Sequence, residues 1–194
     1  DIERFKPMDR RACRERFGLP PSAPVVGYFG FLSGYKGIDL LLEAHRILRR
    51  AGFPAIVLLA GHRRGGTPVE GEGVHDLGLV AHDLIPACIN ACDAVAVPNP
   101  SNDYTDCCFP LKALEAAACG VPVAATALEP VRDLFGPAYP WLARPGDAGD
   151  LAAKLREACG GRGEGLRALA ESHTWERLAG DLAGALAELP CTRG

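Results

Sequence analysis

The sequence predicts a doubly wound α/β domain, in which helices cover both faces of a parallel sheet of about six strands. Segments with strand-like and helix-like patterns alternate about six times along the chain, with short connections between them. Residues 55–61 (AIVLLAG) form a continuous apolar run, which is typical of a strand buried on both faces. The length of 194 residues fits a single domain, and 48% hydrophobic with 23% charged residues is typical of a folded chain.

The first half of the chain contains three predicted strands, at residues 24–32, 55–61 and 74–80. A helical stripe lies between the first two strands, and Gly52 marks its end. This stripe consists of Ile38, Leu41, Leu42, Ile47 and Leu48. The Gly-rich stretch at residues 62–73 predicts a mobile loop. Residues 82–92 predict a helix, because Pro86 is tolerated near its first turn.

The second half continues the alternation. Strands are predicted at residues 93–100 and 121–126, and helices at residues 110–119, 149–159 and 175–189. Pro110 is expected at the first helical position, where its missing N–H leaves no hydrogen bond unmade.

Composition argues against several classes of protein. The formal net charge of −3 disfavours nucleic acid as the main partner, because proteins that bind phosphate backbones normally present a basic face. No apolar run is long enough to span a membrane, and no signal peptide is apparent. Because the chain opens with Asp1 rather than Met, we expect it to be a piece of a longer protein.

The eight cysteines allow two interpretations. Most of them lie among Ala, Leu and Val, which favours small buried hydrophobic side chains in a reducing cytosol. Cys88 and Cys92 are four residues apart and would share a helix face. Together with Cys107 and Cys108 they are candidates for a metal cluster, although no CxxC or Cys/His ligand pair accompanies them.

Residues 30–37 (GFLSGYKG) follow the first strand, at the edge of the sheet where doubly wound folds bind ligands. Gly30 and Gly37 permit tight turns and a close approach of the backbone to a ligand. Lys36 precedes a helix whose free N–H groups favour an anion. This lysine is therefore either a phosphate ligand or an ordinary solvated loop residue.

The polar loop at residues 98–110 precedes a second helix N-terminus. Lys112 lies in its first turn, where a cation is mildly unfavourable unless it reaches an anion at the same place. We expect Leu111, Leu114 and Ala118 to face the sheet. Glu115 would then lie at the edge of that face, either as a ligand of sugar hydroxyls or as a surface carboxylate.

Four blocks of the chain resemble the C-terminal half of family 4 (group 1) retaining glycosyltransferases of the GT-B fold. They are DIERFKP, GYFGFLSGYKGIDLLLEAHRIL, LGLVAHDLIPACINACDAVAVPNPS and PLKALEAAACGVPVAAT. RPGDAGDLAAKL and HTWERLAGDL fit the closing segments of the family, so the match runs through nearly the whole chain in the family's order.

The resemblance implies roles for individual residues. Lys36 would bind the phosphates of a nucleotide-sugar donor, and Glu115 would hydrogen-bond the ribose, and we expect these two to be the catalytic residues. Leu79 and Val80 lie where the family wraps the base. The other expected donor contacts are Gly30, Phe31, Gly37, His62, Asp106, Cys107, Cys108, Phe109, Pro110, Leu111 and Lys112. His75, His82 and His173 have no constellation of partners in the sequence.

The chain departs from the family pattern at two positions. Phe31 stands where the family usually has an arginine, and Lys112 is a candidate to supply the missing charge. Cys107 stands where the first glutamate of the E-x7-E block would fall, although a family variant with PLK before the second glutamate also lacks it. Asp106 or Asp103 would then contact the sugar, unless the role is vacant or filled by backbone.

The resemblance also implies an organisation and an activity. Residues 1–23 would be an interdomain linker, residues 24–173 a Rossmann-like domain that binds a nucleotide sugar, and residues 174–194 a helix that packs back toward an N-terminal acceptor domain. The apolar stripe of that helix should be partly exposed in this chain. The whole enzyme would be a retaining hexosyltransferase, cytoplasmic and peripheral at the inner face of the membrane, and this half alone would be inactive.

No cofactor is expected besides the donor substrate, such as a UDP- or GDP-sugar. No metal is expected, because Lys36, Lys112 and the helix N-termini would neutralise a leaving diphosphate, and the chain has no Asp-x-Asp pair. The alternative is a non-catalytic relative that binds the nucleotide sugar or serves as a scaffold, favoured by Phe31 and Cys107. A dehydrogenase domain is disfavoured, because no G-x-G-x-x-G follows the first strand.

Overall fold

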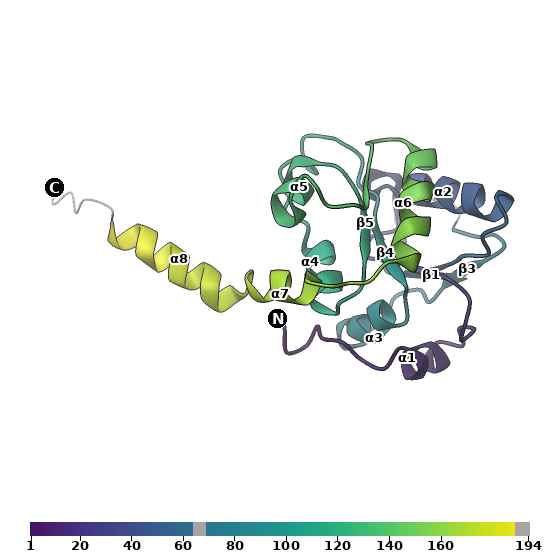
Figure 1. Ribbon diagram of the computed structural model, residues 1–194, viewed down its shortest axis with the longest axis horizontal. Helices are drawn as coiled ribbons and strands as arrows, with labels where there is room; N and C mark the ends of the chain where they lie inside the picture. The colour runs from purple at the N-terminus through teal and green to yellow at the C-terminus, as the bar shows by residue number, and fades with distance from the viewer. Residues whose placement is uncertain (64–68, 189–194) are drawn as a thin grey trace.

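The computed structural model describes residues 1–63 and 69–188 (Figure 1). Its centre is a six-stranded sheet in the order β3-β2-β1-β4-β5-β6, and every pair of neighbours is parallel. The strands are β1 (Val25–Phe29), β2 (Ile56–Ala60), β3 (Val74–Asp76), β4 (Ala94–Val97), β5 (Val123–Thr126) and β6 (Leu142–Ala143). The chain winds outward from β1 in both directions, so the predicted doubly wound, Rossmann-like fold is confirmed.

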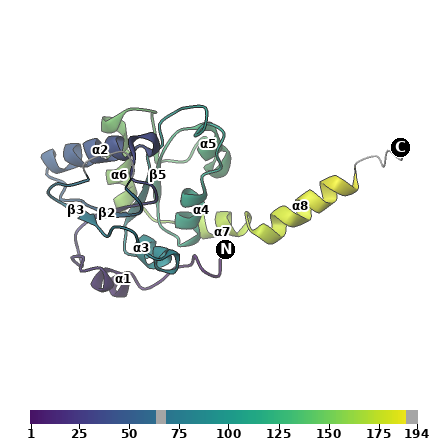
Figure 2. The ribbon, with the colours of Figure 1, turned by 180° about the vertical axis from the view of Figure 1, so that it is seen from behind.

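Helices cover both faces of this sheet (Figures 1 and 2). One face carries α2 (Ile38–Arg50) and α6 (Ala148–Gly160). The other face carries α1 (Arg10–Arg16), α3 (Ile85–Asn90), α4 (Leu111–Ala118), α5 (Glu129–Phe135) and α7 (Leu166–Glu171). Successive residues of β1 point into opposite cores, because side chains alternate along a strand. Every residue of β1 is therefore buried.

Four observed elements have no counterpart among the predicted ones: α1, α5, α7 and β6. None exceeds seven residues, which is too short for a periodic pattern to be recognised. The predicted loop at residues 62–73 lies partly outside the described residues. Within it, Val69 is buried, and Glu72 pairs with Arg49 of α2.

The helix α4 lies at its predicted place but presents a different face to the sheet. Pro110 is its N-cap rather than its first residue. The expectation that Leu111 faces the sheet is wrong, since 54% of this side chain is exposed. The fully buried residues are alanines: Ala113, Ala116 and Ala117. Because these side chains are small, α4 packs closely against β4 and β5, and Leu114 packs partly buried against the same core.

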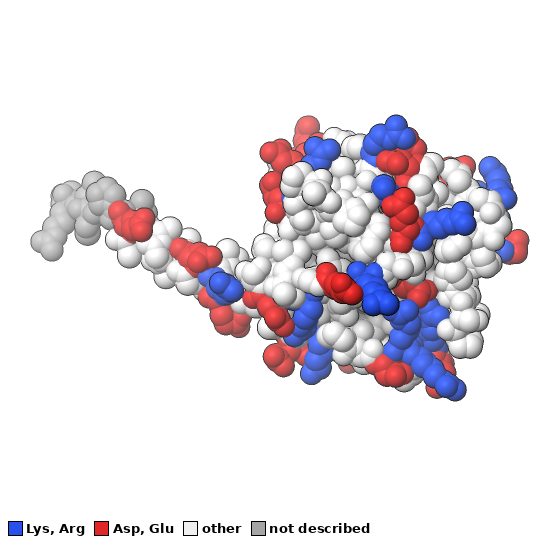
Figure 3. All heavy atoms as spheres, in the orientation of Figure 1, with Lys and Arg blue, Asp and Glu red and all other residues white. Residues whose placement is uncertain are grey.

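The helix α8 (Trp175–Ala187) projects away from the sheet (Figures 1 and 2). Its apolar stripe is between 56% and 65% exposed at Trp175, Leu178, Leu182 and Leu186, as the sequence predicted. Acidic and basic side chains are interspersed with uncharged surface along it (Figure 3). Residues 189–194 of the predicted closing segment lie outside the described residues. Packing of this helix on another domain stays a prediction, as do the boundaries at residues 23 and 173.

Six of the seven described cysteines fall into two groups, and the seventh, Cys159, is half-buried, with the pKa of its thiol raised by burial to about 12. Cys13, Cys88, Cys92 and Cys119 are buried, and burial raises the pKa of each thiol. Cys107 is exposed on the loop before α4, and Cys108 is half-buried beside it. The four thiols that were candidates for a metal cluster are therefore divided between the core and the surface. In the part of the chain that the structure describes, no helix is long and apolar enough to cross a bilayer.

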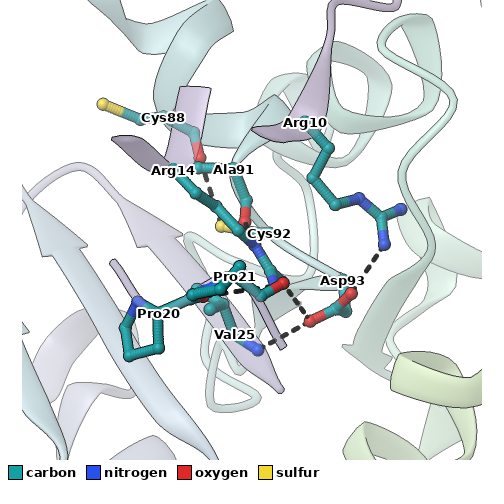
Figure 4. A network of polar contacts seen from close by, with 9 residues as sticks. All are labelled: Arg10, Arg14, Pro20, Pro21, Val25, Cys88, Ala91, Cys92 and Asp93. Carbon is teal, nitrogen blue, oxygen red and sulfur yellow. Dashed lines mark hydrogen bonds and ion pairs between the residues drawn. The ribbon is translucent and has the colours of Figure 1, made fainter. Parts of the chain in front are cut away.

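Arg14 and Asp93 form a buried ion pair at the amino ends of β1 and β4 (Figure 4). Arg14 Nη2 lies 2.6 Å from Asp93 Oδ2, and its other nitrogens donate to the carbonyls of Ala91 and Pro21 at 2.9 and 2.7 Å. Asp93 Oδ2 also accepts the N–H of Val25 at 2.8 Å. This cluster joins α1 to the first residue of β1 and to the turn before β4.

We expect Asp93→Ala to destabilise the fold by about 3–5 kcal/mol, because it leaves the Arg14 guanidinium buried without a counter-charge. Asp93→Asn keeps an acceptor for Val25 N–H and should cost less. Urea unfolding followed by circular dichroism measures both. As a control, Glu43→Ala breaks the exposed pair with Arg46 and should change stability by less than about 1 kcal/mol. Equal losses for Asp93→Ala and Glu43→Ala would contradict the assignment.

Thiol labelling should separate the two groups of cysteines. In a Cys191→Ser background, Ellman's reagent should modify Cys107 first, because its thiol is exposed. Cys88 and Cys92 should react at least about 100-fold more slowly, since they react only when the fold opens. Peptide mass spectrometry after a labelling time course gives the order. If Cys92 were labelled as fast as Cys107 in the folded protein, the core beside α3 would be accessible to the reagent, which would contradict the burial of Cys92.

Candidate functional site

The carboxyl ends of β1 and β2 and the segment that follows β3 surround a pocket of about 280 Å³. Five predicted donor contacts line it: Gly30, Phe31, His62, Leu79 and Val80. The other lining residues were not predicted; they are Phe29, Ala60, Gly61, His82 and Ile85. The structure thus brings together loops that lie about 30 and 50 residues apart in the sequence, at the edge where this class of sheet binds ligands.

The wall of this pocket is mostly apolar. Leu79 is 79% exposed, and Phe31 is half exposed with its ring against His62 at 6.2 Å between centroids in an edge-on arrangement. Phe31 therefore contributes a flat surface where the family usually has a cation. The Tyr28 hydroxyl donates to the Phe31 carbonyl at 2.8 Å, which anchors the loop behind this ring.

Two glycines allow the loops of the site to approach one another. Gly37 has φ +80° and is the N-cap of α2, and a Cβ on it would collide with the carbonyl of Pro98 at the end of β4. Gly30 has φ +140°, and a Cβ there would collide with the Lys112 ammonium. Any other residue at position 37 would separate the loop after β1 from the loop after β4.

Lys112 lies half-buried at the start of α4. Its Nζ is 4.7 Å from the centroid of the Tyr28 ring, which places the ammonium over the aromatic face. Burial, with a smaller contribution from the positive charge of Lys36, lowers the pKa of Lys112 to about 8. The two predicted phosphate ligands therefore lie close enough to repel one another.

Lys36 belongs to the short 3-10 turn η1 (Gly34–Lys36), directly before Gly37. Its Nζ is 4.3 Å from the ring centroid of Tyr104, which comes from the loop before α4, and 5.7 Å from that of its neighbour Tyr35. Lys154 pairs with Glu157, whereas neither Lys36 nor Lys112 forms a salt bridge within residues 1–63 and 69–188. The site thus carries two positive charges without a paired carboxylate.

Glu115 lies one turn beyond Lys112, and burial raises the pKa of its carboxyl group, while the nearby charges of His82 and Lys112 lower it. His82 lies at the start of the 3-10 turn η2 (His82–Leu84), and its Nδ1 is 2.8 Å from a nitrogen of the Arg4 guanidinium. The sequence indicated no constellation of partners around His82, and the fold places Arg4 beside it. The one hint in the sequence that His82 belongs to the site is its position just after Leu79 and Val80. Its contacts Arg4 and Glu115 lie far away in the chain, so the sequence pattern does not reveal them.

The loop before α4 is held by its own hydrogen bonds. Asn102 Oδ1 accepts the N–H groups of Tyr104 and Thr105 at 3.1 and 3.0 Å, and the Thr105 hydroxyl donates to the Pro100 carbonyl. Asp106 Oδ2 accepts the Ser101 hydroxyl at 2.7 Å, so this candidate sugar ligand is partly engaged within the loop.

The last residues before α4 differ in their solvent exposure. Cys107 and Asp103 are exposed, and Phe109 is 50% exposed with its ring 6.2 Å from that of His173. Pro110 is buried beneath them. The N–H of Leu111, one of the expected donor contacts, donates to the Phe109 carbonyl at 3.0 Å, so this amide is already bonded within the chain.

These parts form one edge with two chemically different regions. Lys36 and Lys112 offer positive charge at the junction of the loops after β1 and β4. The pocket offers apolar surface and backbone groups, and His82, one of its lining residues, lies near enough to Glu115 to lower the pKa of that carboxyl group. Such an arrangement fits a ligand that has an anionic part next to a flat, largely apolar part.

Comparison with known proteins shows which family the chain resembles. The sequence model described as "Glycosyl transferases group 1" matches residues 23–160. A D-inositol 3-phosphate glycosyltransferase of Geodermatophilus obscurus is 32% identical over 206 aligned positions, which cover 95% of this chain and 45% of that protein. The enzyme of the same name from Segniliparus rotundus is 36% identical over 138 positions, which cover 64% of this chain and 29% of that protein.

Solved structures share the fold. A sucrose-phosphate synthase from Thermosynechococcus elongatus superposes with a TM-score of 0.75 at 24% identity, over 97% of this chain and 50% of that one. The C-terminal domain of a glycosyl transferase group 1 family protein from Francisella tularensis superposes with a TM-score of 0.69 at 19% identity, over 89% of this chain and 96% of that one. The chain thus spans less than half the length of the sequence relatives named above. On the match of residues 23–160 and the identity to these relatives, the chain belongs to the glycosyl transferases group 1 family.

Proposed function

We propose that this chain is the half of a retaining glycosyltransferase that binds the nucleotide-sugar donor. One observation carries the proposal: the loops after β1 and β4, which bear Lys36 and lead to Lys112, meet where Gly37 contacts the Pro98 carbonyl, and neither lysine has a salt-bridge partner among the described residues. Holding two like charges together in a half-buried site is unfavourable unless an anion joins them. A nucleoside diphosphate supplies that anion, and its base would occupy the apolar pocket beside Leu79 and Val80.

The same residues would assist the transfer step. As the bond between sugar and diphosphate breaks, negative charge grows on the leaving phosphate oxygens, and Lys36 and Lys112 would stabilise it without a metal ion. Lys112 would take the place of the arginine that Phe31 replaces, since its ammonium lies against Gly30. The Glu115 carboxylate would accept hydrogen bonds from the ribose hydroxyls. Asp106 or Asp103 would contact the sugar near Cys107.

The acceptor would be bound by a part of the protein outside this chain. Relatives of about twice this length support that expectation. The alternative, a relative that binds the donor but does not transfer it, is favoured by Phe31 and by the exposed Cys107. Sugar transfer or slow donor hydrolysis by the full-length parent would exclude this alternative.

Calorimetric titration with UDP, GDP and ADP tests the donor site. At least one should bind with a dissociation constant below millimolar, and Lys36→Ala should weaken it about 10-fold or more, because a charge-assisted hydrogen bond to phosphate is lost. Lys154→Ala, whose lysine pairs with Glu157 on α6, is the matched control and should bind as the wild type does. Unchanged binding in Lys36→Ala would refute the phosphate assignment.

Nucleotide binding should weaken as the pH rises above about 8. The pKa of Lys112 is about 8 in the free protein, and a bound anion would raise it by favouring the charged form. Affinity should therefore be full below pH 8 and fall by up to about 10-fold for each unit above it, until the pKa of the bound state is reached. Titrations between about pH 7 and 9 measure this slope, and Lys112→Met should flatten it. If the affinity of Lys112→Met fell with pH as steeply as that of the wild type, the pH dependence would belong to another titrating group.

A further inference from the structure

The two lysines of the site share an unusual environment, since each ammonium lies over a tyrosine ring instead of against a carboxylate. Lys112 Nζ is 4.7 Å from the Tyr28 centroid, and Lys36 Nζ is 4.3 Å from the Tyr104 centroid. A carboxylate would neutralise a lysine and compete with an anionic ligand. An aromatic face attracts the ammonium through its quadrupole and leaves the net charge intact. The tyrosines thus hold the cations in place while keeping them available.

The ring of Tyr104 is well suited to hold Lys36 because it comes from a different loop. Lys36 follows Tyr35 in the turn after β1, whereas Tyr104 belongs to the loop between β4 and α4. The two tyrosine rings are 5.9 Å apart and tilted by 43°, with the ammonium within reach of both. Asn102 fixes the backbone of Tyr104 by accepting its N–H, so the ring is attached to an ordered support.

The repulsion between the two lysines makes such a support necessary. Lys36 is partly exposed, so without a support its ammonium would be free to turn into solvent, away from the charge of Lys112. We propose that Tyr104 is a positioning residue: its ring holds the Lys36 ammonium beside Lys112, where both meet the diphosphate of the donor. This proposal rests on the proposed function for the identity of the anion, but not for the placement of Lys36.

The placement of Lys36 is measured without any ligand. The chain has only four lysines, so the Lys112 side chain can be assigned and titrated by NMR in lysine-labelled protein. Lys36→Met should raise the pKa of Lys112 from about 8, because a like charge is removed. Tyr104→Leu should reproduce most of that rise, since Lys36 is then free to move away, and Tyr104→Phe should leave the pKa near its wild-type value. Tyr104→Leu should add nothing in a Lys36→Met background.

These outcomes decide the proposal. It is overturned if Tyr104→Leu leaves the pKa of Lys112 at the wild-type value, or if Lys36→Met does not change it. Tyr104 is half exposed, so its variants should fold, and circular dichroism checks this. The comparison of Tyr104→Phe with Tyr104→Leu also separates the effect of the ring from that of the hydroxyl group.

Affinity for UDP gives an independent readout. Tyr104→Leu should weaken binding about three- to fivefold, in the range of an exposed cation–π contact, and Tyr104→Phe should restore it. In a Lys36→Met background, Tyr104→Leu should cause no further loss. An equal loss in that background would mean that Tyr104 contacts the ligand directly, which overturns a positioning role. If UDP, GDP and ADP all fail to bind the wild type, the proposed function fails, while the NMR titration still decides the placement of Lys36.

Discussion

The parallel pairing of β1 with both β2 and β4 is the constraint on which the rest of the molecule depends. The chain leaves β1 toward β2 on one side and reaches β4 on the other, so the loops after β1 and β4 lie on opposite sides of the point where the winding reverses. A crevice forms at such a point because no single connection covers it. Gly37 then determines how narrow this crevice becomes, since its missing Cβ lets α2 begin against the Pro98 carbonyl.

The buried ion pair and the proposed binding site lie at opposite edges of this sheet. The Arg14–Asp93 ion pair lies at the amino ends of β1 and β4, where its charges are paired and its remaining hydrogen-bonding groups are satisfied. At the carboxyl ends, Lys36 and Lys112 lie over tyrosine rings. The same type of group, a half-buried or buried cation, is therefore structural where a carboxylate faces it. Where an aromatic face is its partner and no carboxylate pairs with it among the described residues, we propose that it serves a ligand.

Much of the fold and part of the site could be predicted from residue patterns. The alternation of apolar runs and helical stripes indicated the parallel sheet, because strands buried on both faces and their crossover helices differ in period and length. The short elements α1, α5, α7 and β6 carry too few residues for a period. In α4, alanine is compatible with either face, so the pattern wrongly placed Leu111 toward the sheet.

By itself the sequence determined the fold class and indicated the loops of the candidate site and the two lysines within them, because these depend on local order along the chain. Only the tertiary structure decided which distant side chains meet there. Tyr104 reaches Lys36, Arg4 reaches His82, and Phe31 meets His62, and in each pair the partners come from different loops or strands. Such contacts depend on how the loops converge at the end of the sheet, which no local pattern records. The way in which the loops converge therefore determines that Lys36 lies over Tyr104 and Lys112 over Tyr28.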